Sequence, residues 1–142
     1  MGQAADAMHR KIAAFNAQDG KEFQELMGPD IEWAIPGALL RGPDQVAAFN
    51  SALWKEFPDI KLTATRVAQD GAIVVMQGRA EGTHHGTFHT PGGDIPPTGK
   101  CVNLPYSEYI EVGGNVIASA RLVFDRLGLL EQLGVAPAPA RA

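Results

Sequence analysis

Residues 102–112 read VNLPYSEYIEV, and this alternating stretch decides the fold class of the chain. If the stretch is an extended strand, every second side chain lies on the same face. That face carries Val102, Leu104, Tyr106, Glu108, Ile110 and Val112. Five of these six side chains suit burial, and the sixth is a carboxylate. The pattern therefore predicts one strand of a half-buried sheet, with Glu108 on the buried side.

The same alternation recurs before and after this strand. Asp70-Gly71 is a strong hairpin signal between two preceding strands, and Gly113-Gly114 forms the turn into the last one. A shorter strand at residues 31–35 comes earlier in the chain. The four long strands that we predict cover residues 60–69, 72–83, 102–112 and 116–124. They form a meander, so we expect an antiparallel sheet that curls and leaves a cleft on its concave side.

Helical periodicity is found before the meander and again after it. We predict helices around residues 8–15, 23–27, 43–57 and 127–133. Gly28-Pro29 ends the second helix, Pro43 fits the first turn of the third, and Gly134 follows the last. Helices that precede a run of strands indicate an α+β fold, with the helices packed against one face of the sheet.

Residues 84–99 are predicted to be a long loop, because they are too rich in glycine and proline for regular structure. A loop of this length in a compact domain is often a lid or a binding loop. The sequence holds no internal repeat and no linker, so we expect one domain over residues 1–136. Pro137 and Pro139 mark residues 137–142 as a flexible tail.

Composition argues against several classes of function. The chain has 142 residues and a formal net charge of −4, and its basic residues are not clustered among aromatic ones, which disfavours nucleic acid as a partner. Cys101 is the only cysteine, so we expect no internal disulfide and no thiolate metal site. Neither a secretory signal nor an apolar stretch of membrane-spanning length is visible. We therefore expect a cytoplasmic protein without membrane partners.

Glu108 is the first candidate for chemistry. A buried carboxylate is costly unless it is paired or protonated. Inside a pocket, such a group suits general acid–base catalysis. The alternative is that this face of the sheet is only partly covered, and that Glu108 lies at a wet edge.

Asp125 and Arg121 lie at the end of the last predicted strand. Asp125 directly precedes a predicted helix, and aspartate is a preferred N-cap, although a carboxylate at a strand end can also face a cleft. Arg121 is on the strand face opposite the apolar residues Leu122 and Phe124. Either Arg121 is solvated, or it lines a polar cleft while the apolar face packs against another sheet.

The histidines and aromatic residues complete the set of candidates. His84, His85 and His89 permit a metal hypothesis, but no helix fixes their geometry. We favour a single pocket histidine, His84, as a proton shuttle, and we expect no metal. The candidate substrate-binding residues are Trp33, Trp54, Tyr106 and Arg121. For the three aromatic residues, the alternative is a purely structural place in the core.

Five short motifs in this order and spacing resemble the SnoaL-like polyketide cyclase (ester cyclase) group of the nuclear-transport-factor-2-like superfamily. They are residues 13–16 (AAFN), 82–84 (GTH), 96–100 (PPTGK), 124–127 (FDRL) and 130–134 (LEQLG). The resemblance covers nearly the whole chain. It implies an α+β cone, in which a strongly curved antiparallel sheet has N-terminal helices over its concave face, a short C-terminal helix and an apolar pocket. Members of the group are usually dimers.

The resemblance also implies a chemistry. The cyclases of this group close a ring by intramolecular aldol condensation without a metal or cofactor, and Asp125 matches the position of their proposed acid–base residue. A pocket histidine accompanies that aspartate in the family, and Glu108 stands at the corresponding position here. This departure leaves two candidate carboxylates, with His84 as a substitute for the histidine.

Two classes of function follow from these residues. The first is a cofactor-independent cyclase, isomerase or lyase that acts on a hydrophobic carbonyl compound, with Asp125, Glu108 and His84 as catalytic residues and Arg121 stabilising negative charge. The second is a non-catalytic protein, either a binder of a small apolar ligand or a dimeric adaptor, because a fold does not fix a function. An epoxide hydrolase-like enzyme is a further alternative, although no second aspartate accompanies Arg121 and Asp125. In each case we expect a homodimer.

Overall fold

The computed structural model describes residues 2–90 and 92–135. Helices and strands follow one another within these residues in the order of an α+β fold. They are α1 (Gln3–Asn16), α2 (Gly20–Glu25), β1 (Met27–Ile35), β2 (Ala38–Arg41), α3 (Gly42–Glu56), β3 (Lys61–Asp70), β4 (Ile73–Thr83), β5 (Phe88–Thr90), β6 (Gly93–Ile95), β7 (Cys101–Gly113), β8 (Val116–Phe124) and α4 (Arg126–Gln132).

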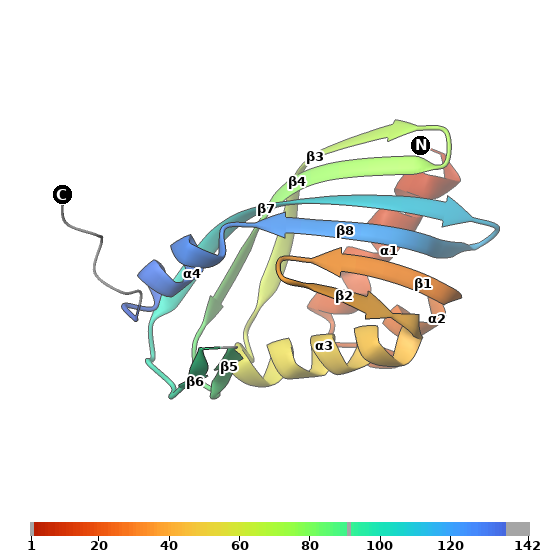
Figure 1. Cartoon of the computed structure of the whole chain (residues 1–142). Coiled ribbons are helices and arrows are strands. Elements are labelled where there is room, and N and C mark those ends of the chain that lie inside the picture. The colour runs from red at the N-terminus through yellow and green to blue at the C-terminus, as the bar shows by residue number, and fades with distance from the viewer. Residues whose placement is uncertain (1, 91, 136–142) are drawn as a thin grey trace.

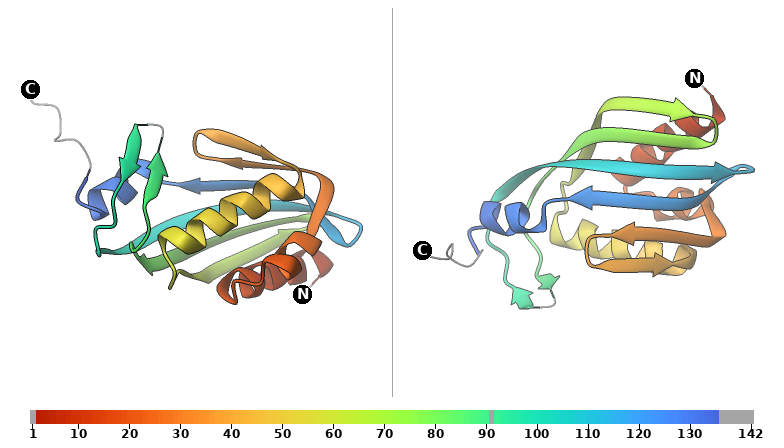
Figure 2. Two further views of the ribbon diagram at one scale, coloured as in Figure 1. Left: turned by 90° about the horizontal axis from the view of Figure 1, so that it is seen from below. Right: turned by 45° about the horizontal axis from the view of Figure 1, so that its top comes forward.

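One curved sheet of six strands forms the body of the molecule, in the order β2-β1-β8-β7-β4-β3 (Figure 1). All neighbouring strands are antiparallel except β1 and β8, which run parallel. The helices α1, α2 and α3 lie together over the concave face, as the view from below shows (Figure 2). Helix α1 contacts β3, β4 and β7, and α3 contacts β1 and β2. The predicted α+β cone is confirmed.

The stretch that predicted the sheet forms strand β7, which pairs with β4 on one side and with β8 on the other. Val102, Leu104, Tyr106, Glu108 and Ile110 are all buried, while the residues between them are exposed or half-buried. Glu108 is only 2% exposed, so it does not lie at a wet edge. Helices cover this face of the sheet, and the buried position of the carboxylate that alternation predicted is confirmed.

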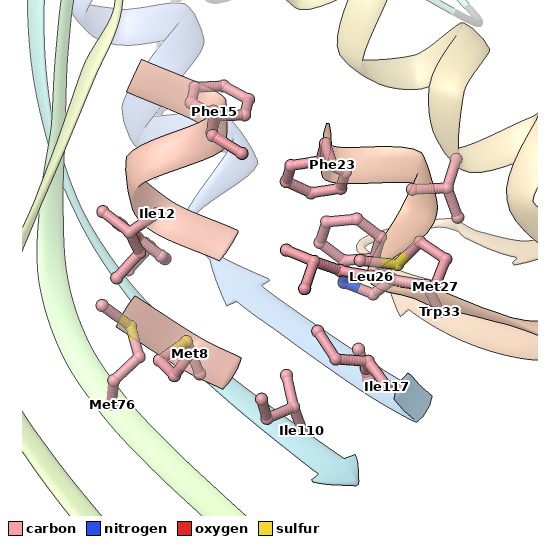
Figure 3. Close-up of a cluster of buried hydrophobic side chains, with 14 of the residues drawn as sticks. Met8, Ile12, Phe15, Phe23, Leu26, Met27, Trp33, Met76, Ile110 and Ile117 are labelled. Carbon is pink, nitrogen blue, oxygen red and sulfur yellow. The ribbon is translucent and has the colours of Figure 1, made fainter. Parts of the chain in front are cut away.

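The core lies between α1, α2 and the concave face (Figure 3). Met8, Ile12 and Phe15 project from α1 toward the sheet, where Met76 and Ile110 are fully buried. Each such side chain contributes about 1.5–3 kcal/mol when it is removed from water. These packed side chains hold α1 and α2 against the concave face of the sheet.

A bulge bends the sheet where β3 crosses β4. Ala64 pairs with Gly78 and Arg66 pairs with Gln77, so Thr65 is an extra residue in β3. Bulges of this kind increase local twist and bend the strand. Gly78 permits the close approach, because a Cβ there would overlap the backbone carbonyl oxygen of Thr63. The curvature that encloses the concave face therefore depends on this glycine.

Three elements differ from the predictions. β1 begins at Met27, so Gly28-Pro29 lies inside this strand and does not end a helix. The pairing of β1 with β8 is interrupted at these residues, so the missing N–H of proline removes no hydrogen bond between the strands. β2 was not predicted, because its four residues are too few to show a period. The predicted loop 84–99 contains the short hairpin β5–β6, so it is not wholly irregular.

The hairpin β5–β6 is stabilised by its own side chains. His89 Nδ1 lies 2.8 Å from Asp94 Oδ1, and the Thr90 hydroxyl donates to the carbonyl of Gly93 at 2.6 Å. These local hydrogen bonds act across a pair of three-residue strands, which is why hydrophobic alternation gave no signal for them.

The predicted tail at residues 137–142 lies outside the described residues. Each of the described helices is too short or too polar to cross a membrane.

We predict that Gly78→Ala destabilises the fold by about 1–3 kcal/mol, because the new methyl group meets backbone rather than a movable side chain. Gly113→Ala in β7 is the matched control, since a Cβ there would lie 3.7 Å from Ala118 Cβ in ordinary contact. Chemical denaturation of both variants measures the difference. Equal stability of the two variants would show that the approach at Gly78 is not essential.

Candidate functional site

A cavity of about 290 Å³ lies between the concave face of the sheet and the helices α1 and α3. Most of its lining is apolar, and much of it is aromatic. The phenylalanine and tryptophan residues of the lining are Phe15, Trp33, Phe49, Phe57, Phe88 and Phe124. The polar or charged lining residues are Lys11, Asn50, Glu56, His89, Tyr106 and Glu108. An apolar cavity with a few polar groups is the usual form of a small-molecule site.

The inner wall of the cavity carries a buried ion pair. Lys11 Nζ lies 2.5 Å from Glu108 Oε1, and each residue is only 2% exposed. This short distance defines a charge pair, although its geometry is not that of a hydrogen bond. The ammonium also lies 5.1 Å from the centre of the Trp33 ring and 5.5 Å from that of Phe23. These aromatic faces add a favourable environment for the cation in a region that water does not reach.

Lys11 was missed at the sequence level, although a signal for it exists. It lies three residues after Met8 and four before Phe15, so it belongs to the apolar stripe of α1. Asn50 lies on the stripe of α3 in the same way, between Val46 and Leu53. The rule that singled out Glu108, a polar residue on an apolar face, identifies both when it is applied with helical spacing.

The side chains of Asn50 and Tyr106 are buried in the cavity lining without hydrogen-bond partners among the described residues, as is the indole N–H of Trp33. Both amide atoms of Asn50 and the hydroxyl of Tyr106 are without a hydrogen bond. Burial, with the negative charge of Glu108 as a smaller cause, raises the pKa of Tyr106, so its hydroxyl keeps its proton. Buried polar groups are nearly always satisfied by protein, water or a ligand. These groups are therefore available to a polar atom inside the cavity.

Glu56, the last residue of α3, is a second carboxyl in the cavity. It is 6% exposed, and burial raises its pKa to about 7, partly offset by the backbone N–H and the ring charge of His89. The backbone carbonyl of Glu56 accepts hydrogen bonds from the N–H groups of His85 at 3.0 Å and Gly86 at 3.1 Å. Glu56 was also missed in the sequence, although it lies three residues after Leu53 and seven after Phe49, so the same helical spacing identifies it.

His84 lies behind the cavity wall rather than in the lining. It is fully buried, its Nδ1 accepts from the backbone N–H of Thr98 at 3.2 Å, and its ring packs 5.4 Å from that of Phe57. Desolvation lowers its pKa. His84 Nε2 has no partner among the described residues, and the ring of Phe88 lies 6.4 Å from that of His84. The structure thus brings His84 near the cavity but not into its lining.

Asp125 and Arg121 lie outside the cavity. Asp125 caps α4, with its carboxylate accepting from the N–H of Gly128 at 3.0 Å, and it is exposed. Arg121 is exposed on the outer face, because its neighbour Leu122 points inward and lines the cavity. Of the two placements considered for Arg121, the solvated one is observed.

Two of the three aromatic candidates line the cavity, and the third does not. Trp33 and Tyr106 line the cavity. Trp54 is not in the lining and packs its ring 5.4 Å from that of Phe15. Within residues 2–90 and 92–135, no group of three or more histidine, cysteine, aspartate or glutamate side chains is placed to hold a metal ion.

A curved sheet around an apolar cavity, covered by N-terminal helices, defines the nuclear-transport-factor-2-like class of proteins. The family model "SnoaL-like polyketide cyclase" matches residues 5–133, and the chain belongs to this family. The predicted family is confirmed. A search of curated proteins gave no match.

Solved structures share the fold over almost the whole chain. A candidate SnoaL-like polyketide cyclase from Jannaschia sp. CCS1 is 24% identical, with a TM-score of 0.83 over 95% of this chain and 94% of the other. IdmH, a candidate polyketide cyclase from Streptomyces antibioticus, is 26% identical, with a TM-score of 0.79 over 94% and 100%. An LEH-like epoxide hydrolase from M. tuberculosis is 18% identical, with a TM-score of 0.72 over 92% of this chain and 89% of the other.

We predict that Lys11→Met destabilises the protein by about 3–5 kcal/mol, because it leaves the Glu108 carboxylate buried without a cation. The double variant Lys11→Met, Glu108→Leu should recover most of this loss, since neither charge remains. Urea denaturation of the single and double variants gives the coupling energy.

The exposed pair Arg10–Glu22, with Nη2 and Oε1 2.8 Å apart, provides the control. Arg10→Met should cost less than about 1 kcal/mol, because solvent screens this pair. A Lys11→Met variant as stable as Arg10→Met would contradict the prediction.

We further predict that Glu56 makes stability fall as pH rises. Its folded pKa of about 7 lies above the ordinary value of 4.5, so the folded protein holds the proton more tightly than the unfolded chain. The cost is therefore absent below about pH 4.5 and complete above about pH 7, where it reaches about 3 kcal/mol. Glu56→Gln removes this cost, so its advantage over the wild type should grow from about pH 5 to about pH 8. The exposed Glu81→Gln is the control, and thermal unfolding at each pH is the measurement.

Proposed function

We propose that this chain catalyses acid–base chemistry on a small, mainly apolar carbonyl compound bound in the cavity between the sheet and the helices α1 and α3. Family membership supports a small-molecule function. The observation that carries the proposal is the Lys11–Glu108 pair, which places a buried carboxylate on the wall of an apolar cavity. Carboxylates in such surroundings act as general bases when they meet an acidic proton.

In the proposed reaction, Glu108 removes a proton from the carbon next to a substrate carbonyl. The electron pair of that C–H bond forms the enolate, and its negative oxygen accepts hydrogen bonds from the Tyr106 hydroxyl and the Asn50 amide. Neither donor has a hydrogen-bond partner in the part of the chain that the structure describes, so neither has to give up another bond to do so. Lys11 holds the carboxylate in place and balances its charge.

The enolate then has two outcomes. Attack of its carbon on a second carbonyl of the same molecule forms a C–C bond and closes a ring, and the resulting alkoxide takes up a proton. Return of the proton to a different carbon gives an isomerisation instead. The same residues serve both reactions, and the substrate decides between them.

Asp125 and His84 stay in the proposal as alternatives to Glu108. Asp125 is the residue that the family resemblance assigns to acid–base work, but its exposed capping position favours Glu108 here. The ring of His84 packs against that of Phe57, which lines the cavity. Neither Asp125 nor His84 is among the residues that line the cavity.

Non-catalytic binding is the second candidate function, and the apolar character of the lining favours it. An epoxide hydrolase is less well supported, because Arg121 and Asp125 are both exposed and absent from the lining of this cavity. We also propose that the chain forms a homodimer through the outer face of the sheet. Val75 and Val123 are 46% and 55% exposed there.

The proposal predicts exchange of the methyl protons of 4-acetylbiphenyl, an apolar aryl ketone, for deuterium in D₂O. Glu108→Gln should slow this exchange at least about 100-fold, and Tyr106→Phe about 10-fold, as measured by NMR. Asp125→Asn should stay within about threefold of the wild type, because that carboxylate lies outside the cavity.

Folding has to be verified for the Glu108 variant, since Lys11 would be left unpaired. Lys11→Met, Glu108→Gln avoids the lone cation and should be equally slow. Loss of exchange in Asp125→Asn with full exchange in Glu108→Gln would assign the base to Asp125. Saturable binding of the ketone without exchange in the wild type would favour the binding function.

A further inference from the structure

Two glutamates line the same cavity in different electrostatic settings. Glu108 and Glu56 are similarly buried, at 2% and 6% exposure. Lys11 lies 2.5 Å from Glu108, whereas no salt bridge among the described residues includes Glu56. A buried carboxyl without a cation favours its neutral, protonated form, and this form is a hydrogen-bond donor.

The two carboxyls enter the cavity at different ends. The carbonyl of Glu56 is bonded to His85 and Gly86, just beyond the end of β4, where Gly82 pairs with Val102. Glu108 pairs with Met76, six residues further along β7 than Val102, which corresponds to about 20 Å of strand. The C-terminal end of α3 lies beside the hairpin β5–β6 (Figure 1). We refer to this end, where the exposed His89 joins the lining, as the mouth of the cavity.

The backbone of Glu56 is held firmly at the mouth. Two N–H groups, from His85 and Gly86, converge on its carbonyl oxygen. A Cβ at Gly86 would overlap the backbone carbonyl of Lys55, so the loop packs directly on the last turn of α3. The Glu56 carboxyl therefore starts from a fixed position, as a group that orients a ligand must.

Few charges act on Glu56. His89 on β5 is its titratable neighbour at the mouth, and the ring of His89 is itself 2.8 Å from Asp94. Across the cavity, the titratable lining residues are Lys11, Tyr106 and Glu108, and Lys11 is already paired with Glu108. The proton on Glu56 thus depends on burial and on His89.

Building on the proposed function, we propose that Glu56 determines the orientation of the substrate. As a protonated carboxylic acid, it donates a hydrogen bond to a carbonyl or hydroxyl oxygen at the mouth, while the reacting carbonyl meets Tyr106, Asn50 and Glu108 at the inner end. The ligand class is an elongated, mainly aromatic molecule with an oxygen at each end. Its middle lies against the apolar wall between the two carboxyls.

Binding of two matched ketones tests this orientation without requiring catalysis. 4-Acetylbiphenyl carries one carbonyl, and 4,4′-diacetylbiphenyl carries a second at the opposite end. The ratio of their dissociation constants reports the gain from the second oxygen. In the wild type this gain should fall about threefold to tenfold from about pH 5.5 to about pH 8.5, because an ionised Glu56 no longer donates. Fluorescence titration at each pH provides both constants.

Glu56→Gln keeps a donor that does not titrate, so its gain from the second carbonyl should be the same at every pH. Glu56→Leu removes the donor and should show the small gain of the wild type at high pH throughout. Glu81→Gln, an exposed glutamate change of the same kind, should follow the wild type. Thermal unfolding checks that each variant is folded.

A pH-independent gain in the wild type would overturn the proposal, and so would a Glu56→Gln variant that loses the gain as the wild type does. The proposed function fails by a separate measurement, the deuterium exchange that depends on Glu108. A protein that orients the diketone but shows no exchange would keep the role of Glu56 and lose the catalytic one.

Discussion

The contact between Lys11 and Glu108 is the constraint on which the rest of the structure depends. Two opposite charges have been removed from water, and each is tolerable only because the other is there. This requirement fixes the depth at which α1 lies across β7 and the face that β7 turns inward. The pair forms part of the wall of the cavity, beside the apolar and aromatic lining residues.

Much of the fold follows from residues whose pattern is local. The alternation of β7 and the hairpin turn at Gly71 predicted the long strands, because both signals lie within a few neighbouring residues. β2 and the parallel pairing of β1 with β8 were not predictable in this way. β2 is too short to show a period, and which strands become neighbours depends on the packing of the whole chain.

The site was predicted in part for the same reason. Glu108, Tyr106 and Trp33 stood out on single strands, and all three line the cavity. The sequence position of Asp125 fitted both a helix N-cap and the acid–base residue of the family. Only the structure shows that its carboxylate caps α4 and lies outside the cavity. Glu56 lies three residues after Leu53, so helical spacing places it on the apolar stripe of α3, but spacing alone does not show that it lacks a salt-bridge partner among the described residues.

The parallel pairing of β1 with β8 has a consequence for the order in which the molecule forms. Trp33, which lines the cavity and covers the Lys11 ammonium, lies beside Ala120 near the other end of the chain. β1 can pair with β2 as soon as both have been synthesised, but it has to wait for β8 before its parallel neighbour is present. Contacts so distant in sequence slow folding and leave apolar surface exposed in the meantime. The wall of the cavity is thus completed only after β8 has formed.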